Sequence, residues 1–168
     1  AQVKGKVRGE ITPGYSVIES GRIRFLHRIA PDLKIIFILR NPVDRAWSAA
    51  RFHFGTVLGK DLGKISEQEY FNYFARKWVV DRGDYVAILS RWRAVLPEKQ
   101  FLLLFNDDIA AEPANVLNKV FSFLDVSQRD NPSGMFERPN KSMETPMPES
   151  VKRHLIELYK LEIEKLEK

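Results

Sequence analysis

The feature that most constrains the fold is a buried-strand pattern that runs directly into a helix start. Residues 34–39 (Lys-Ile-Ile-Phe-Ile-Leu) form a short apolar run without alternation, as expected for a strand buried on both faces of a parallel sheet. Asn41 is a good N-cap, and Pro42 suits the first helical position. We expect this helix to run to about Phe54 and to end at Gly55. A strand followed at once by a helix is typical of α/β proteins.

The junction between this strand and this helix has the composition of an anion site. Arg40 follows the strand end, where open α/β sheets bind ligands, and stands beside the free N–H groups of the helix start. Ser48, about two turns into the helix, can add a hydroxyl donor if the helix rotation turns it toward the same side. The alternative is structural: Arg40 pairs with a carboxylate, and Ser48 packs against its neighbours.

The rest of the chain alternates helical patterns with one further strand. Residues 100–105 repeat the buried-strand pattern, and Ser66 with Glu69 predicts a capping box at one helix start. Also expected are a strand or strand edge at 3–11, helices at 17–29, 66–79, 85–96 and 112–124, a long loop at 127–146 and a helix from 148. This order predicts an α/β fold with a mainly parallel sheet flanked by helices, in a single domain spanning residues 1–168.

The charge balance favours an anionic ligand. The chain has 27 Lys and Arg against 22 Asp and Glu, a net charge of +5, which suits a nucleotide or an acidic glycan. The basic residues are spread along the chain without an aromatic-interleaved tract, so nucleic acid is not the expected partner. No apolar run reaches the roughly 20 residues of a membrane span. The absence of cysteine excludes disulfides and thiol catalysis and is compatible with the cytoplasm, which is the expected location.

The strand–helix junction also carries a family resemblance. Arg40-Asn-Pro-Val-Asp-Arg-Ala-Trp-Ser48 resembles the 3′-phosphate-binding motif of sulfotransferases that use 3′-phosphoadenosine 5′-phosphosulfate (PAPS). The resemblance implies a PAPS-dependent enzyme with a P-loop-like sulfotransferase fold, of the bacterial or heparan-sulfate-type branch. It also implies that Arg40 and Ser48 hold the 3′-phosphate of PAPS and of its product PAP. Weaker matches follow in the family's order, at Gly83-x-Tyr85, Trp92, Phe101–Phe105 and Phe121–Leu124.

A second resemblance indicates the catalytic base. Gly9-Glu10-Ile-Thr-Pro-Gly-Tyr15 is similar to the family's Glu-x-(Ser/Thr)-Pro-x-Tyr segment, in which the heparan-sulfate-type branch uses the glutamate as base. By that resemblance Glu10 removes the proton of the acceptor while other donors neutralise the leaving group. The alternatives are an exposed or salt-bridged Glu10 without a catalytic role, and His53 as the base. No His, Asp or Glu spacing indicates a metal site.

Lys141 is the third predicted nucleotide contact. Asn140-Lys141-Ser142 sits where a late loop of the family closes over the nucleotide. By resemblance Lys141 binds the 3′-phosphate or a group near it, with Arg138 as the alternative contact. The structural alternative is a surface loop.

One element of the family is not found in the sequence. Sulfotransferases begin with a strand and a lysine-bearing phosphate loop that cradles the 5′-phosphosulfate, so we expect that strand and loop to be missing from this chain. Such a piece would hold half of the PAPS site, and a non-catalytic nucleotide- or polyanion-binding module is the alternative function. A P-loop-type group transferase, such as a kinase, is a third possible function, and the lack of a Walker lysine argues against it. The acceptor (a small molecule, a glycan or a lipid) and the oligomeric state stay open.

Overall fold

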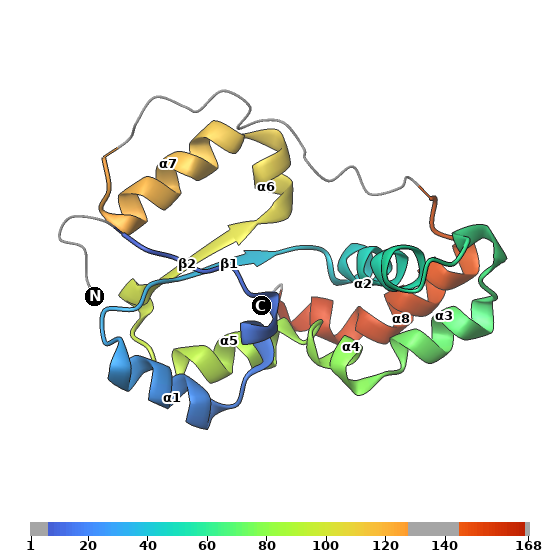
Figure 1. Ribbon diagram of the computed structural model, residues 1–168, viewed down its shortest axis with the longest axis horizontal. Coiled ribbons are helices and arrows are strands. Elements are labelled where there is room, and N and C mark those ends of the chain that lie inside the picture. Colours follow the sequence, from blue (N-terminus) through green and yellow to red (C-terminus); the bar gives the residue numbers. More distant parts are fainter. Residues whose placement is uncertain (1–6, 128–144, 167–168) are drawn as a thin grey trace. The chain divides into compact units, whose positions relative to one another are not determined.

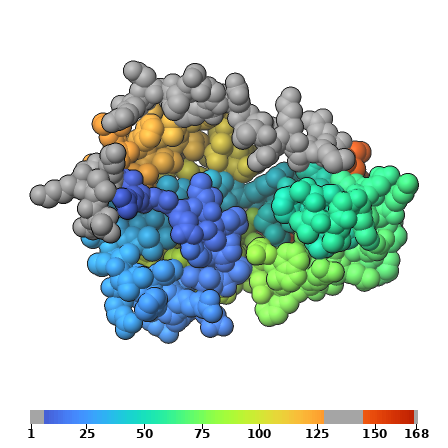
Figure 2. All heavy atoms as spheres, viewed as in Figure 1, coloured from blue at the N-terminus to red at the C-terminus, as the bar shows by residue number. Residues whose placement is uncertain are grey.

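The computed structural model describes residues 7–127 and 145–166, which are coloured by sequence in Figure 1 and Figure 2. These residues divide into two compact units. Residues 7–39 and 91–127 belong to the first unit, and residues 40–90 and 145–166 belong to the second. The single domain predicted for residues 1–168 stays a prediction. In the described part of the chain, no helix is both long enough and apolar enough to cross a membrane.

The first unit is built on two parallel strands, as the two apolar runs predict. β1 (Ile35–Leu39) pairs with β2 (Phe101–Phe105), and the register places Ile35 opposite Phe101 and Leu39 opposite Phe105. The other elements of this unit are η1 (Pro13–Val17), α1 (Ser20–Ile29), η4 (Glu98–Gln100), α6 (Asn106–Ala111) and α7 (Pro113–Leu124). Figure 1 shows α1 on one side of the strand pair and α6 and α7 on the other. Helices on both faces of a parallel pair make an α/β arrangement.

Two side chains at the end of α5 (Tyr85–Arg93) hold the segment that precedes α1. Trp92 is 2% exposed and lies edge-on to Phe37 of β1, with 6.2 Å between ring centroids. Its Nε1 donates to the carbonyl of Ser16 at 3.3 Å, and Arg91 Nη1 donates to the carbonyl of Ile18 at 3.2 Å. The Ser16 carbonyl lies at the C-terminal end of η1 and the Ile18 carbonyl follows it, where helical N–H donors run out. Side-chain donors therefore satisfy these carbonyls and fix the course of the chain.

The second unit consists of helices packed around an aromatic core. Its elements are α2 (Pro42–Arg51), η2 (Phe52–Val57), η3 (Leu62–Lys64), α3 (Glu67–Phe74), α4 (Lys77–Asp81), the first residues of α5 and α8 (Glu149–Leu166). α2 packs against both α3 and α8. The buried cluster contains Val43, Ala46, Trp47, Ala50, Phe54, Leu62, Tyr70, Tyr73, Phe74, Val79, Val151, Leu155 and Tyr159. Packing on two sides therefore holds the helix in which the sequence places the anion site.

An arginine and a close ring contact tie α2 to α4 and α8. Arg45 Nη2 donates to the Tyr159 hydroxyl at 2.9 Å and to the Val79 carbonyl at 3.1 Å. The Arg45 guanidinium also lies 5.8 Å from the centroid of the Tyr159 ring. A Cβ atom built at Gly83 would lie 2.2 Å from Cε1 of the same ring, so the ring occupies the space that a side chain at Gly83 would need.

Three of the elements expected before residue 60 differ from the structure. The helix expected at 17–29 begins at Ser20, after the short helix η1 that contains Val17. α2 ends at Arg51, and the chain continues as the π-helical turn η2 to Val57, where the helix was expected to end at Gly55. The chain reverses instead at Gly59, whose φ of 62° a glycine adopts without steric cost, and Lys60 N–H then bonds to the Phe54 carbonyl. Residues 7–11, predicted to be a strand or strand edge, form no strand; Ile11 is 97% exposed, so this segment buries no apolar face.

The helix predicted at 66–79 is two helices, α3 and α4, separated by an extended residue at Arg76. Phe74 and Val79 are both fully buried. Five residues apart on one continuous helix, they would point about 140° from each other at 100° per residue. The break therefore allows both side chains to enter the same core.

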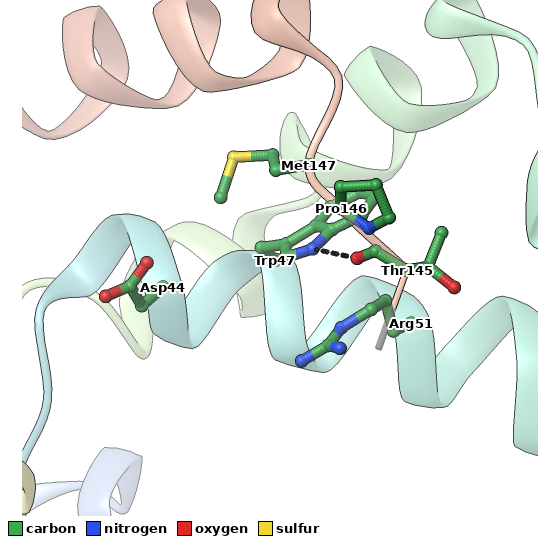
Figure 3. Close-up of a pocket in the computed structure, with 6 residues that line it drawn as sticks. All are labelled: Asp44, Trp47, Arg51, Thr145, Pro146 and Met147. Atoms are coloured by element: carbon green, nitrogen blue, oxygen red, sulfur yellow. Dashed lines mark hydrogen bonds between the residues drawn. The ribbon is translucent and has the colours of Figure 1, made fainter. Parts of the chain in front are cut away.

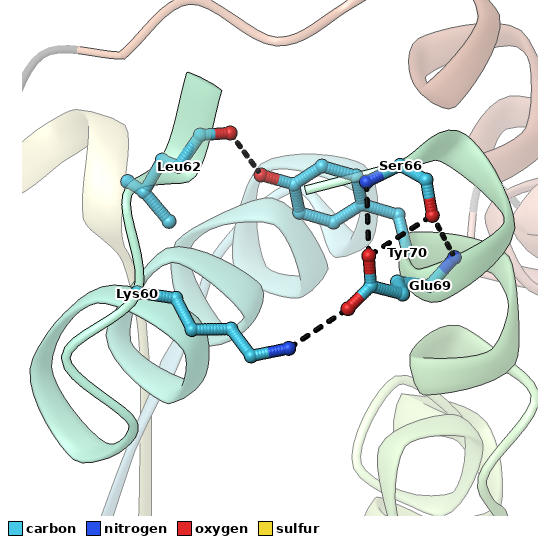
Figure 4. Close-up of polar contacts among 5 residues, drawn as sticks. All are labelled: Lys60, Leu62, Ser66, Glu69 and Tyr70. Atoms are coloured by element: carbon cyan, nitrogen blue, oxygen red, sulfur yellow. Dashed lines mark hydrogen bonds and ion pairs between the residues drawn. The ribbon is translucent and has the colours of Figure 1, made fainter. Parts of the chain in front are cut away.

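The start of α3 confirms the predicted capping box (Figure 4). Ser66 Oγ accepts from the Glu69 N–H, and Glu69 Oε2 accepts from the Ser66 N–H at 3.1 Å. Lys60 Nζ donates to Glu69 Oε1 at 2.8 Å, and the Tyr70 hydroxyl donates to the Leu62 carbonyl at 3.2 Å. The hydrogen bond from Lys60, followed by those from Ser66, lowers the pKa of Glu69 to about 2. These contacts fix the loop that leads from η2 to α3.

Candidate functional site

Arg40 lies where the sequence predicts it, directly after β1 and before the cap of α2. Its backbone carbonyl accepts a hydrogen bond from the Tyr85 hydroxyl at 2.9 Å, and Tyr85 is 7% exposed. Burial raises the pKa of Tyr85, so the phenol stays a neutral donor. Over residues 7–127 and 145–166, the Arg40 guanidinium has no hydrogen-bond or ion-pair partner. The carboxylate partner of the structural alternative is thus not found in these ranges.

The start of α2 is capped as predicted. Asn41 Oδ1 accepts from the Val43 N–H at 2.9 Å. Ser48 lies in the second turn of α2, is half-buried, and donates no hydrogen bond to another described residue. It neighbours Asp44 and Arg51 on the helix surface, because four and three residues separate it from them. Arg40 and Ser48 thus belong to the same unit. Arg40 precedes the N-terminus of α2, and Ser48 lies within this well-packed helix.

A hollow of about 440 Å³ opens beside α2 (Figure 3). Asp44, Trp47 and Arg51 line it from α2, and residues 145–147 line it from the segment before α8. Trp47 Nε1 donates to the Thr145 carbonyl at 3.3 Å, which holds that segment to the helix. The hollow combines a carboxylate and a guanidinium with an apolar wall, next to Ser48 on the helix surface.

Glu10 is exposed, as one alternative expects, and lies in the first unit. Its Oε1 accepts hydrogen bonds from Thr12 Oγ1 at 2.7 Å and from the Tyr15 hydroxyl at 2.8 Å. These bonds, first that of Thr12 and then that of Tyr15, hold the pKa of Glu10 below its ordinary value. In return, the bond to Glu10 raises the pKa of Tyr15. Glu10 is therefore an ionised carboxylate with two neutral donors, and no salt bridge joins it to another described residue.

His53, the alternative base, packs among aromatic rings in the second unit. Its ring stacks on Tyr73 with 4.8 Å between centroids and meets Phe54 edge-on at 5.1 Å. Burial, with smaller contributions from the charges of Arg76 and Lys60, lowers the pKa of His53. The imidazole is thus held neutral by its surroundings, as a base requires, but within an aromatic cluster.

Lys141 and Arg138 lie outside the described residues, so their predicted contacts to the nucleotide stay predictions. Among the residues that the structure describes, no group of three or more His, Asp or Glu side chains gathers in a way that could hold a metal ion.

The sequence reasoning missed the roles of Thr12 and Tyr85. In the sequence Thr12 is only one position of a motif, whereas in the structure its hydroxyl bonds the candidate base. A sequence signal for this cluster exists: Glu10 is followed by hydroxyl side chains two and five residues later, at Thr12 and Tyr15, with a proline turn between them. Tyr85, which the sequence marks only within the weak match Gly83-x-Tyr85, is a core residue that fixes the backbone of Arg40.

Comparisons with known proteins agree with the motifs. A family model described as the sulfotransferase domain matches residues 25–148. Heparan sulfate glucosamine 3-O-sulfotransferase 6 from Mus musculus is 28% identical over 130 residues, which cover 74% of this chain and 36% of that protein. Membrane-associated sulfotransferase kil1 from Dictyostelium discoideum is 32% identical over 115 residues, 68% of this chain and 22% of that protein. The chain thus spans about a third or less of the length of these relatives.

A solved structure confirms the predicted fold. The crystal structure of a sulfotransferase from Alicyclobacillus acidocaldarius matches with a TM-score of 0.61 at 22% sequence identity. The match covers 88% of this chain and 58% of that one. At this identity the likeness shows a shared fold, which is the sulfotransferase-like α/β arrangement expected from the sequence.

Proposed function

The chain belongs to the sulfotransferase domain family, and on that premise we propose that this protein is an enzyme that moves a sulfuryl group from PAPS to a hydroxyl or amine acceptor. The observation that carries the proposal is the segment from Arg40 to Ser48. The guanidinium of Arg40 and the hydroxyl of Ser48 have no hydrogen-bond partner among the other described residues. The same segment contains the N-terminus of α2, which is a firmly packed helix. A cation at the N-terminus of a helix, where the helix dipole favours negative charge, suits a phosphate.

In this proposal Arg40 and Ser48 hold the 3′-phosphate of the nucleotide. Arginine binds phosphate oxygens through two parallel N–H donors, so its planar fork orients the group as well as neutralising it. The bond from Tyr85 to the Arg40 carbonyl supports the role, because it fixes the backbone from which the guanidinium extends. Lys141 is the proposed second cation.

Glu10 is the proposed base. PAPS supplies the activated sulfuryl group, and the protein must place the acceptor in line with the sulfur and take its proton. An ionised, solvent-accessible carboxylate is suited to that step, and the lowered pKa of Glu10, caused by the hydroxyls of Thr12 and Tyr15, keeps it ionised at neutral pH. His53 is the alternative base; its packing between Tyr73 and Phe54 makes it less accessible than Glu10.

The proposed acceptor is a carbohydrate hydroxyl. The relatives include proteins named as heparan sulfate glucosamine 3-O-sulfotransferases and as a carbohydrate sulfotransferase. The net charge of +5 suits an acidic glycan. Small-molecule and lipid acceptors are the competing classes, and the cytoplasmic location and bacterial origin stay predictions.

Nucleotide binding is tested by calorimetric titration of the full-length protein with PAP. We expect binding that Arg40→Ala weakens by about 10-fold to 100-fold, as for loss of a charge-assisted contact. Arg24→Ala removes an exposed arginine of α1 and is the control variant that leaves the affinity unchanged. The nucleotide assignment is refuted if PAP does not bind or if Arg40→Ala binds it as well as the parent protein.

Turnover is tested with radiolabelled PAPS and a panel of one acidic glycan, one phenol and one lipid. Sulfated glycan as the main product supports the proposed acceptor class, and a labelled phenol or lipid contradicts it. Glu10→Gln should lower kcat by about 100-fold or more, the scale of a lost general base, without changing PAP affinity. PAP binding with no transfer to any acceptor would support the non-catalytic binding module instead.

A further inference from the structure

The carboxylate of Glu10 is held through one of its two oxygens. Thr12 Oγ1 and the Tyr15 hydroxyl donate to the same atom, Oε1, at 2.7 and 2.8 Å. Oε2 receives no hydrogen bond from any other residue in the described ranges. Two donors on one oxygen restrict rotation of the carboxylate and leave the lone pairs of the other oxygen open.

The two donors are themselves fixed by local structure. Thr12 occupies the N-cap position of η1, and its carbonyl accepts from the Tyr15 N–H at 3.0 Å. Pro13 at the first helical position restricts the backbone of this turn. One residue further on, the Ser16 carbonyl accepts from the buried Trp92 indole. The turn that carries both hydroxyls is thus anchored to the core of the first unit, while Glu10 lies in the exposed segment before it.

We propose that Thr12 and Tyr15 are positioning residues that hold Glu10 through Oε1 and leave Oε2 as the atom that accepts the proton of the acceptor hydroxyl. The inference rests on the proposed function, in which Glu10 is the base. As the acceptor oxygen bonds to sulfur, its proton moves to Oε2, and the bond between sulfur and the bridging phosphate oxygen breaks. The electron pair of that bond leaves with PAP, and the proton on Glu10 later passes to solvent.

The arrangement has a consequence for pH dependence. Among the described residues, the polar groups that contact the Glu10 carboxylate are the two hydroxyls. Both stabilise its ionised form, so the pKa of Glu10 lies below its ordinary value. Removing either hydroxyl therefore raises that pKa and frees the carboxylate to rotate. The acid limb of the rate profile moves to higher pH, and the rate on the plateau falls because fewer carboxylates point Oε2 at the acceptor.

The test uses Thr12→Val, Tyr15→Phe and the double variant in the full-length protein. Carbon-detected NMR titration of the Glu10 carboxyl measures its pKa without requiring activity. Each single variant should raise the pKa, and the double variant should raise it further. The acid limb of kcat/KM should shift with it, and kcat should fall about 5-fold for each lost hydrogen bond. Ser16→Ala is the matched control, because its hydroxyl bonds the Pro13 carbonyl and not Glu10.

The outcomes separate this inference from the proposed function. If Glu10→Gln abolishes turnover while the double variant leaves the Glu10 pKa, the acid limb and kcat unchanged, the positioning role is overturned and the base assignment stands. If Glu10→Gln retains full turnover, the base assignment fails and this inference fails with it. Parallel shifts of the carboxyl pKa and the acid limb, absent in Ser16→Ala, support the positioning role.

Discussion

Gly83→Ala is expected to destabilise the second unit, since the new methyl group would collide with the ring of Tyr159. The added Cβ would lie 2.2 Å from Cε1, 2.8 Å from Cζ and 3.0 Å from the hydroxyl oxygen of Tyr159. Non-bonded carbon atoms rest at about 3.5–4.0 Å, so the ring must move by more than about 1 Å. Tyr159 is 1% exposed, and its packed surroundings oppose that movement.

The size of the effect follows from two costs. Overpacking a filled core costs about 1–3 kcal/mol. Moving the ring also weakens the bond between the Tyr159 hydroxyl and Arg45 Nη2, now 2.9 Å. A hydrogen bond from a charged donor contributes about 1.5–3 kcal/mol, and its partial loss costs about 1–2 kcal/mol. We therefore expect Gly83→Ala to lower the free energy of unfolding by about 2–5 kcal/mol.

Urea denaturation followed by circular dichroism measures the change. Gly21→Ala is the control variant. Gly21 is the second residue of α1, with no atom within 4 Å of its Cβ position, so the substitution should stabilise the helix by at most about 0.5–1 kcal/mol. In a Tyr159→Leu background the ring is gone, and Gly83→Ala should cost less than about 1 kcal/mol. Equal costs of Gly83→Ala in the two backgrounds, or a cost near zero in the parent protein, would refute the steric explanation.

Further predictions concern the cap, two titrating groups and metal dependence. Asn41→Ala should lower the free energy of unfolding by about 1 kcal/mol through loss of the cap bond to Val43, whereas Asn41→Asp, which keeps an acceptor, should not; urea titrations check both. The lowered pKa of Glu69, about 2 against an ordinary 4.5, means that its ionised form stabilises the fold above pH 4.5 and that this contribution is lost as the pH falls toward 2. The difference in the free energy of unfolding between Glu69→Gln and the parent protein should therefore shrink as the pH falls from 4.5 toward 2. Near neutral pH this difference should stay constant. Because burial lowers the pKa of His53 from 6.5, NMR should show it titrating below pH 6.5, and titration at or above that value contradicts its burial among the rings. Sulfuryl transfer should be unchanged by excess EDTA, and a loss of rate that Mg²⁺ restores would contradict a metal-free reaction.

The local elements of the site were predictable because their signals are short-range. The strand before Arg40, the Asn41 cap and the capping box at Ser66 and Glu69 each depend on residues within a few positions of one another. The helix boundaries were less predictable. The break at Arg76 exists because Phe74 and Val79 must reach one core, and no local pattern encodes that requirement.

The sequence by itself determined the family, the parallel α/β pairing and the position of Arg40 and Ser48 at the start of one helix, because apolar runs, caps and a contiguous motif carry that information along the chain. Only the tertiary structure decided the roles of the remaining polar groups. Arg45 is another cation of the same motif, but it has a structural role. Its guanidinium donates to the Tyr159 hydroxyl and the Val79 carbonyl, which lie far from it in the sequence. The Arg40 guanidinium, five residues earlier, has no such partner in the described part of the chain. Two arginines of equal charge thus differ in function because burial and hydrogen-bond partners, not residue type, determine which of them is available to bind a ligand.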